Sequence, residues 1–335
     1  MKVDNLNSEL KAKTVVESEP IAIVCAADNK YAMPLAVTMC SVIENLNKNR
    51  KVVFFIIDGG IHNTNKQKIL KSLVLENCEV NFLSLSDSLL HHVKEVHQPL
   101  ESETVTIKAD YVSITSFYRL LIPLLLPNEF EKAIYLDCDL VVRGDLGELW
   151  QADIGDNYVL AAQDSWIPYV SSPTGRLNYQ KLGLNTQSKY FNAGVLVINL
   201  KKWREDQLTA KAIKYFKQNL EYVGWYDQGI LNALLAGQWG EIEPRWNCSP
   251  SSVYSYSSWQ DSPFSEEDYY NLIHDPYIIH FVSAKKPWNS RHTLLKEYFF
   301  QYVDMTAWSG WRLTIWRRLW LRLVREFRQV ISVIQ

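Results

Sequence analysis

The chain has 335 residues and a formal net charge of −2, and 47% of its residues are hydrophobic and 21% charged. This length and balance are typical of one large or two small globular domains with a sizeable core. The near-neutral charge argues against a general nucleic-acid-binding protein, and no nucleic-acid partner is predicted. The five cysteines are odd in number and lack a paired Cys-x-x-Cys spacing. We therefore expect neither a disulfide scaffold nor a zinc site, and a reducing compartment fits best.

The first 20 residues are polar, with acidic residues interspersed. They lack the apolar core of a signal peptide, and we predict a flexible leader over residues 1–20. The whole chain contains no uninterrupted apolar stretch of about 18 residues, so no helix is predicted to span a membrane.

Strands and helices alternate at the start of the chain. Apolar runs predict strands, and apolar residues at helical spacing predict helices. In chain order we predict strand Ile21–Ala27, helix Tyr31–Asn45, strand Val52–Ile57, helix Asn65–Leu75 and strand Val80–Leu85. This rhythm predicts an α/β fold with a parallel, doubly wound sheet, in which ligands bind beyond the carboxyl ends of the strands. Asp28 and Asp58 lie at two such ends.

The run Ala133–Val142 predicts a buried strand that ends by presenting Asp137 and Asp139 together, within an otherwise apolar run. Buried carboxylates are costly unless their charge is compensated, and a divalent cation such as Mg²⁺ or Mn²⁺ is the usual compensation. Residues i and i+2 of an extended segment point the same way, so both side chains would reach one ion. The alternative is a turn at the end of the strand with two solvated carboxylates.

The rest of the chain carries further elements of both kinds. We predict a helix over Ser116–Leu126, strands over Val159–Ala162, Phe191–Leu200 and Tyr277–Val282, helices over Trp203–Leu220 and Gln228–Ala236, and an irregular loop over Asn247–Asp275. Pro123 would strain or kink the first of these helices if it were interior. Loops as long as the last often cover or line a binding site.

Five segments in this order and spacing resemble glycosyltransferase family 8, and within it the bacterial lipopolysaccharide galactosyl- and glucosyltransferases. The segments are Ala26–Tyr31, Tyr135–Val142, Tyr190–Trp203, Tyr226–Asn232 and Ile279–Trp288. The resemblance implies a GT-A fold over residues 21–290, with a mostly parallel, Rossmann-like central sheet flanked by helices. It also implies Mn²⁺-dependent transfer of a hexose from a UDP-sugar donor with retention of anomeric configuration.

The resemblance implies a metal site made by Asp137, Asp139 and His280. An imidazole beside two carboxylates suits Mn²⁺ better than Mg²⁺, although Mg²⁺ is a conceivable substitute. The alternative for His280 is a histidine with only a structural role. Lys286 would place a positive charge on the donor phosphates; its alternative is a solvated surface lysine, as Lys285 is expected to be.

Donor-binding residues also follow from the resemblance. The uridine segment corresponds to Ala26, Ala27, Asp28 and Tyr31, whose ring offers a stacking face. Arg119 corresponds to an arginine near the donor sugar and phosphate, with a surface salt bridge as its alternative. Cys138, between the two aspartates, and Ser283 complete the predicted donor-binding set. Two positions depart from the family pattern, because Lys30 stands where Asn is common and Ser283 where Gly is usual.

Asp164, Asn192, Asp227 and Gln228 match residues that surround the transferred hexose in the family. Asp164 and Asp227 would accept hydrogen bonds from sugar hydroxyls. Gln228 would lie on the β-face of the anomeric carbon, where an amide is a poor nucleophile. We therefore favour front-face attack, with the Gln228 carbonyl oxygen stabilising positive charge, over a covalent intermediate on a carboxylate.

A basic, aromatic tail is predicted over residues 291–335. From Trp308 to Gln335, six Arg stand against one acidic residue, a net charge of +5, so the preceding 307 residues carry −7. At helical spacing most of the Arg fall on one side and the aromatic and aliphatic residues on the other. We predict an amphipathic helix over 308–334 that lies on an anionic membrane surface. The alternative is a helix that packs on the protein's own core.

These observations together predict a hexosyltransferase that moves glucose or galactose from a UDP-sugar to a glycan acceptor, a lipopolysaccharide or glycolipid core. It would be cytoplasmic and peripheral on the inner face of the plasma membrane. The alternatives are a metal-dependent nucleotide-sugar hydrolase or nucleotidyltransferase, and a catalytically idle UDP-sugar-binding protein.

Overall fold

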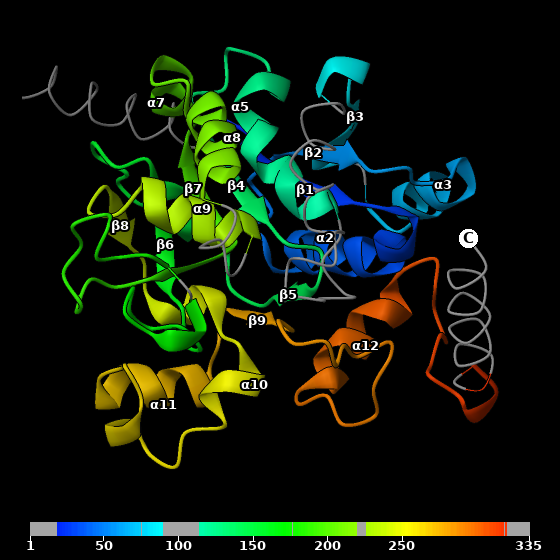
Figure 1. The fold of residues 1–335 in the computed structure, drawn as a ribbon. Helices are drawn as coiled ribbons and strands as arrows, with labels where there is room; N and C mark the ends of the chain where they lie inside the picture. The colour runs from blue at the N-terminus through cyan, green and yellow to red at the C-terminus, as the bar shows by residue number, and fades with distance from the viewer. Residues whose placement is uncertain are drawn as a thin grey trace, which may run out of the picture.

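The computed structural model describes residues 19–74, 76–89, 114–175, 177–219, 226–317 and 319 (Figure 1). Most of the predicted leader and the tail beyond residue 319 lie outside these ranges. The leader and the membrane-binding helix therefore stay predictions.

A seven-stranded sheet forms the centre of the molecule, in the order β3-β2-β1-β4-β7-β6-β8 (Figure 1). Its strands are β1 (Ile21–Ala27), β2 (Val52–Asp58), β3 (Cys78–Ser84), β4 (Lys132–Leu136), β6 (Val159–Gln163), β7 (Phe191–Asn199) and β8 (Trp239–Glu241). The continuous apolar runs of β1, β4 and β7 are buried because helices cover the sheet. The predicted parallel β-α-β-α-β unit at the start of the chain is confirmed.

One central strand runs against the others. β7 pairs antiparallel with β4 on one side and with β6 on the other, with Leu136 opposite Val195. The remaining pairs in this sheet are parallel. The start of β7 therefore lies at the same edge as the carboxyl ends of β4 and β6, and this edge collects residues from all three.

The buried strand predicted in Ala133–Val142 ends at Leu136, directly before the two aspartates, and the rest of the run forms a second strand. The run divides into β4 and β5 (Leu140–Val142), and β5 pairs antiparallel with β9 (Ile278–His280) in a separate two-stranded sheet. The chain leaves the central sheet at Asp137, Cys138 and Asp139, where Asp137 N donates to Gly194 O (2.8 Å) and Phe281 N donates to Asp139 O (2.9 Å). The two aspartates thus lie on a bend between two sheets and not on one extended strand.

Helices and short 3₁₀ turns surround the sheets (Figure 1). They are η1 (Asn29–Tyr31), α2 (Ala32–Asn45), α3 (Asn63–Lys71), η3 (Ile114–Leu121), α5 (Ile122–Leu125), α6 (Leu146–Gln151), η4 (Pro173–Gly175), α7 (Leu200–Glu205), α8 (Leu208–Gln218), α9 (Tyr226–Leu234), η6 (Pro244–Asn247), α10 (Pro250–Val253), η7 (Trp259–Asp261), α11 (Glu266–His274) and α12 (Lys296–Met305). Helix α2 packs on β5 and α12, whereas α8 packs on α9 and η3.

Two predicted helices are interrupted. The helix expected over Trp203–Leu220 ends at Glu205 and restarts at Leu208, because Gln207 adopts a left-handed conformation (φ 52°). The helix expected over Ser116–Leu126 begins as the 3₁₀ segment η3, and Pro123 lies in the first turn of α5, where its missing N–H costs nothing.

The prediction of an irregular loop over Asn247–Asp275 is wrong. This segment folds into α10, η7 and α11 around a small core of its own, made by Cys248, Val253, Phe264, Tyr269 and Leu272. Ser265 caps α11, because its Oγ accepts from Asp268 N at 3.1 Å. Short polar stretches with Ser and Pro gave no helical periodicity, yet they serve here as caps and first turns.

The segment after β9 packs on the body. Phe299, Tyr302 and Val303 of α12 are buried with Ile279 and Phe281. A chain of ring contacts runs from Tyr31 to Trp288 (5.7 Å between centroids), Phe299 (5.2 Å), Phe300 (5.7 Å) and Trp311 (6.4 Å). Residues 296–311 therefore belong to the same packed unit as η1.

All five cysteines lie in described segments as free thiols, and Cys25, Cys40, Cys138 and Cys248 are buried. Among the described residues, no helix combines the length and the apolar character that crossing a bilayer requires.

Candidate active site

Three acidic or amide side chains meet at the sheet edge where β4 and β6 end and β7 begins. Asp137 follows β4, Asp164 follows β6, and Asn192 is the second residue of β7. The backbone holds them together, since Asp164 N donates to Tyr190 O at 2.8 Å and Asp137 N donates to Gly194 O. The reversed direction of β7 is what brings Asn192 to this edge.

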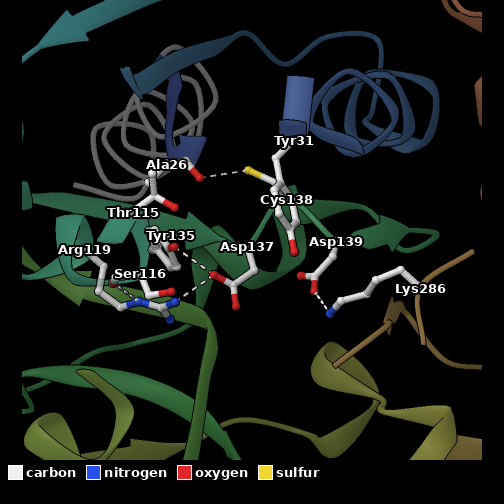
Figure 2. Close-up of a pocket in the computed structure, with 10 residues that line it drawn as sticks. All are labelled: Ala26, Tyr31, Thr115, Ser116, Arg119, Tyr135, Asp137, Cys138, Asp139 and Lys286. Atoms are coloured by element: carbon white, nitrogen blue, oxygen red, sulfur yellow. Dashed lines mark hydrogen bonds and ion pairs between the residues drawn. The ribbon is translucent and has the colours of Figure 1, made fainter. Parts of the chain in front are cut away.

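Asp137, Asp139 and His280 present one ligand atom each to a common point. These atoms lie within 4.8 Å of one another. His280 Nε2 is 3.6 Å from Asp137 Oδ2 and 3.2 Å from Asp139 Oδ1. The second oxygen of each carboxylate is engaged elsewhere, because Asp137 Oδ1 accepts from Tyr135 and Arg119, and Asp139 Oδ2 pairs with Lys286 (Figure 2).

This arrangement fits a divalent cation. Two carboxylate oxygens and one imidazole nitrogen form a donor set that Mn²⁺ accepts. Burial alone would raise the pKa of Asp139, but Lys286 and His280 outweigh it and hold that pKa well below its usual range, so the carboxylate is ionised and ready to ligate. Gly194 leaves the space that the site needs, since an added Cβ would lie 2.9 Å from Asp137 Oδ2 and 2.8 Å from His280 Nδ1.

Arg119 joins the metal-site carboxylate to Asp227. Its Nη2 is 2.9 Å from Asp137 Oδ1 and its Nε is 2.7 Å from Asp227 Oδ2, while the guanidinium lies over the Tyr135 ring at 4.6 Å. Arg119 is only 5% exposed, which excludes the alternative of a surface salt bridge. Burial raises the pKa of Asp227 to about 6, with Arg119 opposing the rise.

Asp164 is saturated with hydrogen bonds. Its Oδ1 accepts from the backbone N of Trp166 (2.7 Å) and Ile167 (2.8 Å), and its Oδ2 accepts from Asn192 Nδ2 (2.9 Å) and Gln228 Nε2 (3.0 Å). Gln228 is fixed at its other end too, because its Oε1 accepts from Ala193 N at 3.0 Å. Three of the predicted sugar-site residues, Asp164, Asn192 and Gln228, thus form one network around the Asp164 carboxylate, whereas the fourth, Asp227, pairs with Arg119.

A cavity of about 150 Å³ opens beside the two aspartates. It is lined by Ala26, Tyr31, Thr115, Ser116, Arg119, Tyr135, Asp137, Cys138, Asp139 and Lys286 (Figure 2). Cys138 closes one wall, since its Sγ donates to Ala26 O at 3.2 Å. Most of the predicted donor-binding residues therefore surround one hollow, although they come from four segments of the chain.

Three predicted donor-binding residues stand outside the lining of this cavity. Ala27 is buried in the core at the end of β1. Asp28 caps η1, with Oδ1 accepting from the backbone N of Lys30 (2.9 Å) and Tyr31 (3.1 Å). Ser283 lies in a turn, where its Oγ accepts from Lys285 N at 3.2 Å. Their predicted contacts with the donor stay predictions.

Lys286 differs from the surface lysine that was its alternative. It is 6% exposed, pairs with Asp139 and donates to the carbonyl oxygens of Phe281 and Val282. Its neighbour Lys285 is exposed, as expected.

Three further residues contribute to the site without a signal in the sequence. Tyr135 reads as an apolar strand residue, yet its hydroxyl donates to Asp137 Oδ1 at 2.8 Å. Gly194 provides the space described above. Asn247 contacts His280 Nδ1 through its Oδ1 at 2.8 Å. The sequence around Asn247, Glu-Pro-Arg-Trp-Asn-Cys-Ser-Pro over residues 243–250, is mixed in character and gave no signal for this residue.

Comparison with known proteins agrees with this geometry. The family model for glycosyl transferase family 8 matches residues 22–292. The chain is 28% identical to general stress protein A of Bacillus subtilis (88% of this chain, 96% of the relative) and 33% identical to a putative glycosyltransferase of Haemophilus influenzae (70% and 65%). It is also 25% identical to a lipopolysaccharide 1,2-glucosyltransferase of Escherichia coli (88% and 81%).

Among solved structures, the chain is similar to the galactosyltransferase LgtC in complex with donor and acceptor sugar analogues. The two share 27% identity and a TM-score of 0.69, over 85% of this chain and 96% of that one. The predicted α/β fold, with a mainly parallel central sheet flanked by helices, is confirmed. The chain belongs to glycosyltransferase family 8.

Proposed function

We propose that this protein is a Mn²⁺-dependent, retaining hexosyltransferase that moves glucose or galactose from a UDP-sugar to a glycan acceptor. The observation that carries the proposal is the convergence of Asp137, Asp139 and His280 beside a cavity that Arg119 and Lys286 line. The buried side chains of Arg119 and Lys286, beside the proposed metal site, supply positive charge that would compensate the negative charge of a nucleoside diphosphate.

Asp137, Asp139 and His280 would hold the metal, which when bound supplies Lewis-acid stabilisation of the diphosphate leaving group. The protein's own residues do the rest. Lys286 and Arg119 are 6% and 5% exposed, so their fixed positive charge is screened less by water than a charge at the surface would be. The Tyr31 ring, held edge-on against Trp288, offers a face to the base.

Front-face attack is the favoured route to retention. A covalent intermediate needs a free carboxylate, but Asp164 accepts four hydrogen bonds and Asp227 is paired with buried Arg119. Gln228 is held at both ends of its amide. Its carbonyl oxygen keeps one lone pair to stabilise positive charge at the anomeric carbon. Asp164, whose acceptor positions are all occupied, holds Asn192 and Gln228 in place, while Asp227 would accept from a hexose hydroxyl.

A lipopolysaccharide or glycolipid core is the proposed acceptor. The support is the likeness to a lipopolysaccharide 1,2-glucosyltransferase and to a galactosyltransferase solved with an acceptor sugar analogue. Among the described residues, no side-chain contact specifically favours the alternatives, which are a nucleotide-sugar hydrolase or nucleotidyltransferase and a catalytically idle UDP-sugar-binding protein.

The basic tail is proposed to hold the protein on the cytoplasmic face of an anionic membrane. In the described part of this segment, Ile315, Trp316 and Leu319 are 55%, 80% and 45% exposed. Large apolar side chains next to Arg312 and Arg317 are the composition of an interfacial helix. A lipid-linked acceptor would then be presented at the same surface.

The first test is UDP release from a panel of UDP-sugars with Mn²⁺, with and without a glycan acceptor. We expect release from one UDP-hexose that depends on metal and acceptor and is lost in Asp139→Asn. Asp156→Asn, whose side chain is fully exposed, is the matched control and should keep full activity. Rapid release without acceptor would favour the hydrolase, and absence of both release and UDP binding would exclude the proposed function.

A further inference from the structure

We propose that Asn247 is a positioning residue that sets the tautomer of His280 and thereby aims its Nε2 lone pair at the metal site. The inference rests on the proposed function, because it takes His280 as a metal ligand. It starts from a relay of three hydrogen bonds that leads from Asp164 through Asn192 and Asn247 to His280.

The relay has a fixed direction at its Asp164 end. Asn192 Nδ2 donates to Asp164 Oδ2 at 2.9 Å, and Asn192 Oδ1 accepts from Gly194 N at 2.9 Å. A backbone N–H can only donate, and an ionised carboxylate can only accept. Both partners therefore dictate the same orientation for the Asn192 amide, and a flipped amide would lose both bonds.

That direction is passed on to Asn247. Asn192 presents its Oδ1 acceptor to Asn247. Asn247 must therefore face it with the Nδ2 donor, and this hydrogen bond from Asn247 Nδ2 to Asn192 Oδ1 is 2.9 Å long. Its Oδ1 is thereby left facing His280 Nδ1 at 2.8 Å. An amide oxygen can only accept, so the proton of His280 belongs on Nδ1.

The chemical consequence appears at the other ring nitrogen. In a neutral imidazole with its proton on Nδ1, Nε2 carries the lone pair. Nε2 is the atom that faces Asp137 Oδ2 and Asp139 Oδ1. Asn247 is 8% exposed and Asn192 is 8% exposed, so water competes weakly for either bond. The same three bonds also tie the metal ligand to Asp164, the proposed sugar-site carboxylate.

The test measures the dissociation constant of Mn²⁺ by electron paramagnetic resonance, in the presence of UDP, for the wild type and three variants. Asn247→Leu removes the acceptor, and we expect Mn²⁺ to bind 10–100-fold more weakly, the usual cost of losing a group that orients a ligand. Asn247→Asp keeps an acceptor for Nδ1–H and should bind Mn²⁺ within about threefold of the wild type, since carboxylate–histidine–metal arrangements are common.

Asn247→Asp should nevertheless transfer sugar more slowly, because it loses the donor to Asn192. This split between metal affinity and turnover is what a purely structural role would not produce. Asn199→Leu, at the far end of β7, is the control for loss of a half-buried amide, and it should leave Mn²⁺ affinity unchanged.

Equal Mn²⁺ affinity in Asn247→Leu and the wild type would overturn the role of Asn247 while leaving the proposed function intact. Equal losses in Asn247→Leu and Asn247→Asp would overturn it as well, since packing alone would then explain both. If the wild type bound no Mn²⁺ with UDP present, the proposed function and this inference would fall together.

Discussion

Arg119 and Asp227 form an ion pair that is almost closed to solvent, with Nε 2.7 Å from Oδ2 and each side chain 7% exposed. The same guanidinium reaches Asp137. One cation therefore compensates a carboxylate from the predicted metal site and one from the predicted sugar site. Because buried charges are costly when unpaired, this single side chain carries much of the electrostatic balance of the site.

Replacing Arg119 with Gln should lower the free energy of unfolding by about 3 kcal/mol, since it leaves buried Asp227 and half-buried Asp137 without this partner. Urea denaturation of the metal-free protein measures the change. Lys189→Gln breaks the pair with Glu241, whose side chains are 44% and 40% exposed, and should cost less than about 1 kcal/mol. Equal effects of the two substitutions would contradict the burial argument.

The pKa of Asp227 gives a pH dependence with a definite sign. Burial raises it from 3.8 to about 6, so between these values the folded protein keeps a proton that the unfolded chain has lost. The free energy of unfolding should therefore fall as pH rises through this range, by about 3 kcal/mol from this group.

Asp227→Asn cannot ionise and should escape this loss. The stability of the variant relative to the wild type should increase between pH 4 and pH 7, as measured by urea denaturation without metal. A difference that stays constant across this range would show that Asp227 titrates normally.

Gly194→Ala should disrupt the metal site. The added Cβ would meet the His280 ring, with Nδ1 at 2.8 Å, as well as Asp137 Oδ2 at 2.9 Å. Because both neighbours must move, we expect Mn²⁺ affinity to fall at least tenfold, as measured by titration calorimetry. In Gly237→Ala the added atom meets open space at a positive φ of 73°, so this control should lose a little stability and keep its Mn²⁺ affinity.

Removing the chain after Thr314 should abolish binding to anionic liposomes and leave UDP-sugar cleavage in solution unchanged, as measured by co-sedimentation and UDP release. The cut belongs after this residue because Thr306 is buried and Trp311 stacks on Phe300. Truncation before Met305 would remove these contacts and destabilise the body. Undiminished liposome binding by the shortened protein would refute the membrane role of the tail.

The sequence was sufficient to predict elements whose signal is local. The strands and helices from Ile21 to Ser84 follow from periodicity, and their order implies a parallel sheet. The residues that converge on the candidate site were named through the resemblance, which combines segments that no local pattern connects. The structure adds that Asp137, Asp139 and His280 lie within reach of one ion.

Features that depend on tertiary packing were not predictable in this way. An apolar run looks the same whether it forms one strand or two, so the sequence did not decide between an extended segment and a turn at Asp137–Asp139. The direction of β7 depends on its neighbours, yet it decides where Asn192 lies. Asn247 carries no periodic signal at all, and only its contacts with Asn192 and His280 reveal it.

The chain of rings from Tyr31 through Trp288, Phe299 and Phe300 to Trp311 has a consequence for geometry. Rings packed at these separations hold their relative positions, so the departure point of the last segment is fixed relative to the proposed uridine pocket. If a membrane binds this segment as proposed, the pocket would lie at a fixed distance from the point where the segment leaves the body. Membrane binding by the tail would then also limit how far the donor pocket lies from an acceptor anchored in the same membrane.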